Sequence, residues 1–121
     1  MVTGVQDVYY NVQDMARAVA FYRDVLGLTV TDEDAHFTGL KAGGVRVGLH
    51  WTGGTAVPNI PHDAHGPHCG GTVTFSVANA ADAKTQLQAK GVHILGYSEN
   101  PWGTIVIFQD LDGNILKLMQ Q

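Results

Sequence analysis

The sequence predicts an α+β fold made of two similar βαβββ modules, because a stretch near its start returns in its second half. Residues 8–18 and 73–83 match in register, with an offset of about 65 residues. Both stretches begin with the alternation of apolar and polar residues that is typical of a half-buried strand, and both continue into a helix capped by Asp or Asn. Further apolar runs, separated by glycines, follow each helix and predict three more strands per module.

The first module is expected over residues 1–53. A strand is predicted over residues 5–12, and Asp14 caps a helix that Gly27 ends. The apolar stripe of this helix consists of Met15, Val19, Tyr22 and Leu26. The remaining strands are expected to start at Leu28 and to cover residues 36–41 and 45–51, with a turn at residues 42–44. The alternation in 45–51 points Trp51 toward the helix layer, and we expect it to pack in the core.

Residues 54–71 are expected to link the modules, because Gly, Pro, His, Asn and Thr dominate there without periodicity. The second module is expected over residues 72–121. Asn79 caps its helix and Gly91 ends it. Its strands are predicted over residues 72–77, 92–95, 105–109 and 115–119, with an Asp-Gly turn within residues 110–114.

The composition restricts the expected partners. The net charge is −4, and the 7 Lys and Arg residues form no basic cluster, which argues against nucleic acid and against an anionic membrane surface. No apolar run reaches membrane-spanning length, and the first residues do not form a secretory signal, so we expect a soluble cytoplasmic protein. The single cysteine, Cys69, is expected to be a loop residue and not a catalytic thiol.

Three sequence blocks resemble the vicinal oxygen chelate superfamily, which contains glyoxalase I, extradiol dioxygenases and the bleomycin- and fosfomycin-resistance proteins. They are Phe21-Tyr-Arg-Asp-Val-Leu-Gly-Leu28, Pro101-Trp-Gly103 and Asp110-Leu-Asp-Gly-Asn114. The resemblance implies paired βαβββ modules that form an open, curved sheet around a cavity, with the helices on the outer face. It also implies a homodimer, and it leaves open whether modules are exchanged between subunits.

The resemblance further implies four positions for the ligands of a divalent metal, which in this chain are Asp7, Gly48, Thr72 and Lys117. Gly48 has no side chain, neutral Thr72 is a poor ligand, and Lys117 brings a positive charge where an acidic ligand would be needed. We therefore expect no metal and no other cofactor. A divalent metal is the alternative.

Side chains on the inward polar face of the strands are the candidates for binding a ligand. They are Asp7, Tyr9, Asn11, Arg46, His50, Thr72, Thr74 and Lys117, to which Trp102 of the Pro-Trp-Gly loop is added. Asp7 and Lys117 are expected to converge, either as an ion pair that fills a vacated metal site or as groups that orient a ligand.

Histidines provide the main alternative chemistry. His50 is either a wall residue, a general base or a displaced metal ligand. His62, His65 and His68 recur at three-residue intervals in the expected linker, a pattern that can bind zinc, copper or nickel. Because proline and glycine interrupt this pattern, a solvated or lid-like loop is the favoured interpretation.

These observations favour a protein that binds a small organic molecule in a homodimer, without the metal of the superfamily. The first alternative is an enzyme of the lyase, isomerase or dioxygenase type. It would use either a metal held by His50 and the histidine loop, or acid–base groups among Asp7, His50 and Lys117. The second alternative is a structural or regulatory dimer whose cavity is filled by side chains.

Overall fold

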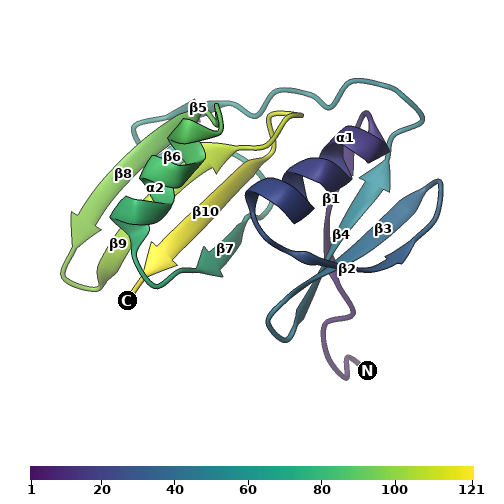
Figure 1. Ribbon diagram of the computed structural model, residues 1–121, viewed down its shortest axis with the longest axis horizontal. Helices are drawn as coiled ribbons and strands as arrows, with labels where there is room; N and C mark the ends of the chain where they lie inside the picture. The colour runs from purple at the N-terminus through teal and green to yellow at the C-terminus, as the bar shows by residue number, and fades with distance from the viewer. The chain divides into compact units, whose positions relative to one another are not determined.

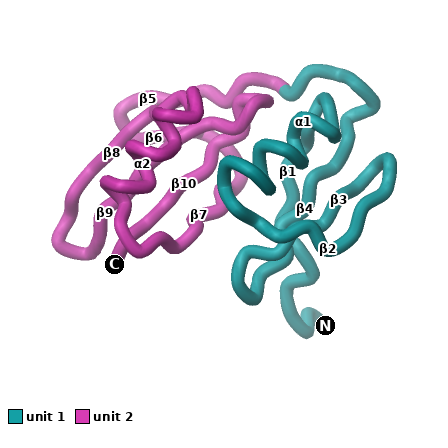
Figure 2. The backbone as a smooth tube through the Cα atoms, in the orientation of Figure 1, with its two compact units in different colours: residues 1–57 teal, residues 58–121 magenta.

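The computed structural model describes all residues from Met1 to Gln121. The chain divides into two compact units, Met1–Val57 and Pro58–Gln121 (Figure 2). The boundary lies inside the segment 54–71. Each unit contains one four-stranded mixed sheet with a helix across one of its faces (Figure 1). The predicted α+β class and the order βαβββ are therefore confirmed for both units.

Unit 1 has its sheet in the order β1-β4-β3-β2. The elements are β1 (Val8–Val12), α1 (Met15–Ala20), β2 (Thr29–Glu33), β3 (Phe37–Ala42) and β4 (Val45–Trp51). Strand β1 pairs with β4 in parallel, because the helix and two strands intervene and return the chain to the same end. The sequence predicted that the first strand starts at residue 5. In the structure it starts at Val8.

The helix of unit 1 changes its winding midway. Its first turns are α-helical, and the Asp14 carboxylate accepts a hydrogen bond from the Arg17 N–H at 3.1 Å. Residues Phe21–Val25 continue as a π-helix, and the Leu26 N–H donates to the Phe21 carbonyl. The first module has one residue more between its capping residue and its glycine than the second module has. A π-helical turn takes up such an extra residue.

Unit 2 repeats the sheet order as β7-β10-β9-β8. The elements are β7 (Val73–Ser76), α2 (Ala80–Ala89), β8 (Ile94–Asn100), β9 (Gly103–Gln109) and β10 (Ile115–Gln120). The prediction that a strand begins at Val92 was wrong, because the Val92 N–H closes the helix by donating to the Leu87 carbonyl. The hairpin β8–β9 is also longer than predicted and turns at Pro101-Trp102.

The segment 54–71 contains a short hairpin that the sequence did not predict. Its strands are β5 (His62–Asp63) and β6 (Gly66–Pro67). The Asp63 carboxylate accepts a hydrogen bond from the His65 N–H at 2.8 Å, which stabilises the turn. Gly66 adopts a φ of 98°, a conformation that favours glycine.

Each sheet buries the face that its helix covers. The fully buried side chains between sheet and helix include Val12, Tyr22, Leu40, Val47 and Leu49 in unit 1, and Val106, Phe108 and Leu116 in unit 2. Trp51 is an exception to the predicted core. It is half-buried at the last position of β4, where its indole N–H reaches the Gln13 carbonyl at 3.0 Å. Neither helix has the length and apolar character that crossing a membrane requires.

Candidate functional site

The polar face of the sheet in unit 1 carries an aromatic ring where a metal-ligating side chain is absent. Phe37 of β3 lies opposite His50 of β4, and Gly48 lies next to this pair. The Phe37 ring covers Gly48: a Cβ atom added at Gly48 would lie 2.9 Å from Cε1 and from Cε2, and closer still to Cζ. Real Cβ atoms essentially never show such distances, so a side chain at position 48 requires the ring to move.

Phe37 belongs to a row of rings on this face. The centroids of Tyr9 and Phe37 are 6.0 Å apart with an interplanar angle of 71°, which is an edge-to-face contact. Tyr9 also lies 5.7 Å from the ring of His50. Tyr9 is 52% exposed, so this row offers a planar ligand an accessible surface for stacking.

Arg46 connects this row to two carboxylates. Its guanidinium lies 5.0 Å from the centroid of the Phe37 ring, a cation–π contact. Nη1 donates to Asp7 at 3.1 Å, and Nη2 donates to Asp32 at 2.7 Å. The hydrogen bond from the Thr31 hydroxyl, followed by the one from Arg46, lowers the pKa of the exposed Asp32. Asp7 is thus held by a cation of its own unit.

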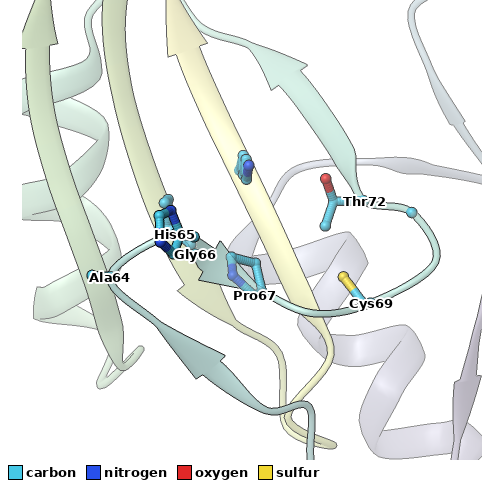
Figure 3. Close-up of a pocket in the computed structure, with 9 residues that line it drawn as sticks. Ala64, His65, Gly66, Pro67, Cys69 and Thr72 are labelled. Atoms are coloured by element: carbon cyan, nitrogen blue, oxygen red, sulfur yellow. The ribbon is translucent and has the colours of Figure 1, made fainter.

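The polar face of unit 2 carries Lys117, which lies on β10 between Thr74 of β7 and Ile107 of β9. A hollow of about 390 Å³ lies over this part of the sheet. Its lining consists of Ala64, His65, Gly66, Pro67, Cys69, Gly71, Thr72, Ile107 and Lys117. Figure 3 shows the loop with His65, Pro67 and Cys69 running across the strands and returning to Thr72, just before β7. The histidine loop thus forms one wall of the hollow.

A contact between Asp63 and His68 links the two sides of this loop, and it is an ion pair only when His68 is protonated. Asp63 lies 3.0 Å from the Nε2 atom of His68, and both side chains are about half exposed. The hydrogen bond from His68, followed by the one from the His65 N–H, lowers the pKa of Asp63. No group of three His, Cys, Asp or Glu side chains in this structure is placed to hold a metal ion.

The predicted site residues divide between the units. Unit 1 holds Asp7, Tyr9, Asn11, Arg46 and His50, and unit 2 holds Thr72, Thr74, Trp102 and Lys117. Asp7 contacts Arg46, Tyr9 contacts His50, and Asn11 pairs with His50 in the register of the strands. Trp102 lies in the β8–β9 turn, is 60% exposed and does not line the hollow. Asp7 and Lys117 lie in different units, so their expected convergence stays a prediction.

Two side chains that shape these surfaces were missed in the sequence: Phe37 and Ile107. The positions of both side chains could have been predicted from the hairpin turns, which set the register of the strands. A two-residue turn at Gly43-Gly44 pairs Ala42 with Val45, and counting back along both strands places Phe37 opposite His50. The same counting from the turn within 110–114 places Ile107 beside Lys117.

A second hollow, of about 490 Å³, lies on the helix side of unit 1. It is lined by Met15, Ala16, Val19, Arg23, Glu33, Asp34, Ala35 and Thr38. Arg23 is already paired with Asp24 at 2.8 Å, and the Asp34 carboxylate accepts hydrogen bonds from the backbone of the β2–β3 turn. This hollow contains none of the predicted site residues.

Comparison with known proteins decides the family. The sequence profile of the Glyoxalase/Bleomycin resistance protein/Dioxygenase superfamily matches residues 4–118. The chain belongs to this superfamily. The resemblance found in the sequence is therefore confirmed. Comparison with curated proteins found no match.

Solved structures of this superfamily share the fold over nearly the whole chain. Lactoylglutathione lyase from Agrobacterium tumefaciens is 24% identical, with a TM-score of 0.74 and coverage of 98% of this chain and 94% of that one. The fosfomycin resistance protein FosX from Listeria monocytogenes is 14% identical, with a TM-score of 0.78 and coverage of 100% and 95%. A glyoxylase/bleomycin resistance protein/dioxygenase domain from Frankia sp. is 23% identical, with a TM-score of 0.73 and coverage of 99% and 93%. At these identities the likeness shows the fold alone.

Proposed function

We propose that this member of the superfamily binds a small organic molecule without a metal. The observation that carries the proposal is the Phe37 ring, which packs over Gly48 at the position that the superfamily's pattern assigns to a metal ligand. We propose that the protein acts as a homodimer, because each sheet leaves edge strands that can pair with a second subunit. The proposed location is the cytoplasm.

The residues of unit 1 do not fit a divalent cation. Gly48 supplies no donor atom, and the space above it belongs to Phe37. Of the two metal-ligand positions in unit 1, Asp7 and Gly48, only Asp7 has a carboxylate. This carboxylate already accepts a hydrogen bond from Arg46 at 3.1 Å. A metal at Asp7 would meet the guanidinium charge at close range, which opposes its binding.

The residues of unit 2 fit a divalent cation no better. Thr72 offers a neutral hydroxyl, which is a weak ligand compared with histidine or a carboxylate. The protonated amine of Lys117 has no lone pair to donate, and its positive charge repels a cation. Three of the four positions therefore lack a competent ligand, and no step of the proposed function uses a metal.

The surfaces that remain suit binding. The hollow of unit 2 combines apolar Ile107 and Pro67 with polar Thr72 and Lys117, the mixture that is typical of small-molecule sites. The row of Tyr9, Phe37 and His50 in unit 1 adds an aromatic surface. A binding protein needs complementary shape and a few polar contacts, and both units supply them.

The test is a ligand screen by thermal shift with chelator-treated protein, combined with metal analysis. The proposal predicts substoichiometric Zn, Ni, Mn and Fe in the purified protein, and melting temperatures that rise with a ligand whether or not chelator is present. Stabilisation that requires added metal, and that disappears in the Asp7→Ala variant, would contradict the proposal.

The hollow of unit 2 also favours a second candidate, an acid–base enzyme that uses no metal. His65, Cys69 and Lys117 line the same space, and each is a side-chain type that transfers protons. Product formation distinguishes this candidate from a binding protein. Incubation of a bound ligand with chelator-treated protein, followed by mass spectrometry, yields a product if the protein is an enzyme and unchanged ligand if it is not.

A further inference from the structure

We infer that the hollow over the sheet of unit 2 binds small organic carboxylates, with Lys117 as the group that recognises the anion. The inference rests on the proposed function, which it deepens by naming the class of ligand. It follows from the charge, the shape and the donors of the hollow.

The only formal charge in the lining of the hollow is the positive charge of Lys117. Lys117 is the only lysine, arginine, aspartate or glutamate among the nine residues of the lining. Within unit 2, Lys117 takes part in no ion pair. The nearby loop carboxylate, Asp63, accepts hydrogen bonds from the His68 side chain and from the His65 N–H. A half-buried ammonium without a counterion attracts an anion from solution.

The position of Lys117 holds the ammonium over the sheet. On β10 it alternates with Leu116 and Leu118, which are buried against the helix layer, so its side chain projects from the opposite face. Ile107 flanks it on β9, and Thr74 flanks it on β7. The aliphatic stem of a lysine rests well on such neighbours while its charged end reaches the ligand.

The donors and the size favour a carboxylate with a short apolar body. Thr72 and His65 provide further hydrogen-bonding groups in the lining of the same hollow, while Ile107 and Pro67 provide apolar surface. A volume of about 390 Å³ is close to the lower end for small-molecule sites. One ammonium matches one negative charge. A phosphate dianion is usually bound by several donors, such as an arginine fork or a helix N-terminus, and the lining contains neither.

The test is a titration of ¹⁵N-labelled, chelator-treated protein with benzoate, followed by NMR. Benzamide, which has nearly the same shape and no charge, and inorganic phosphate are titrated in parallel. We expect benzoate to shift the amide signals of Thr72, Ile107 and Lys117 with a Kd of roughly 1 mM, a usual affinity for so small a ligand. Benzamide and phosphate are expected to bind at least about tenfold more weakly.

The Lys117→Met variant keeps the aliphatic stem and removes the charge, so its affinity for benzoate should fall about ten- to a hundredfold. Lys117→Arg keeps the charge and should retain most of the affinity. Lys84→Met is the matched control: Lys84 is a half-buried lysine on α2 that stacks on Tyr97 at 4.8 Å, outside the hollow. This variant should bind benzoate like the wild type.

Several results would overturn the inference. They are the absence of shifts with benzoate, equal affinity for benzamide, tighter binding of phosphate, and unchanged affinity in a folded Lys117→Met variant. If that variant does not fold, the comparison of benzoate with benzamide on the wild-type protein still decides. Binding of neutral ligands without metal would contradict the carboxylate inference but would agree with the proposed function. Binding that needs an added metal would contradict the proposed function itself.

Discussion

Replacement of Gly48 by alanine is expected to destabilise the protein, although alanine is normally the better residue in a strand. The new Cβ would lie 2.9 Å from two carbons of the Phe37 ring and closer to a third, so the ring must leave its place. Overpacking of this kind costs about 1–3 kcal/mol, while removal of a glycine from a strand returns about 0.5–1 kcal/mol. The net loss in the free energy of unfolding is therefore about 1 kcal/mol and at most about 2.5 kcal/mol, measurable by urea denaturation.

A double-mutant cycle with Phe37→Ala tests the cause. Without the ring, Gly48→Ala should become neutral or stabilising by about 0.5–1 kcal/mol, so the coupling energy between the two positions is about 1–3 kcal/mol. Gly96→Ala is the control, because a Cβ there meets Ile107 Cδ1 at an ordinary 3.7 Å. Additive effects in the cycle, or a Gly48→Ala variant as stable as the control, would refute the placement of Phe37 over Gly48.

Three further predictions concern the metal, the loop and the assembly. The purified protein should contain substoichiometric divalent metal. Stoichiometric metal that is lost on Asp7→Ala would contradict this, and metal that is lost instead on changing His65 and His68 would indicate a displaced site. The lowered pKa of Asp63 means that its contribution to the loop is present above its ordinary pKa of 3.8 and is lost as the pH falls through the lower folded value. NMR signals of the hairpin should accordingly change in strong acid, and Asp63→Asn should remove that change. Light scattering should show a dimer at micromolar concentration, and a monomer would contradict the proposed assembly.

The sequence predicted the modules because their signals are local. Each signal lies within a few residues of the sequence. The signals are the alternation up to Val12, the helix caps Asp14 and Asn79, and the glycines that end the helices. The hairpin β5–β6 escaped detection, since two-residue strands carry no periodicity. The π-helical turn at Phe21–Val25 likewise keeps the apolar pattern of an α-helix.

The candidate site was harder to predict than the fold, because its contacts join distant residues. Asp7 and Arg46 are 39 positions apart, and the alternation placed them on one face without showing that they pair. The ring of Phe37 over Gly48 depends on the register of a hairpin and on the side-chain rotamer. The alternation also placed Lys117 inward, but the wall that the histidine loop builds beside it is a tertiary contact.

The most direct test of metal-independent binding is calorimetric titration of benzoate, or of a better ligand from the screen, into protein that has been dialysed against chelator and analysed for metals. We predict the same Kd before and after chelation, and no change on addition of Zn²⁺ or Mn²⁺. An affinity that disappears with the metal and returns when the metal is restored would contradict the central claim.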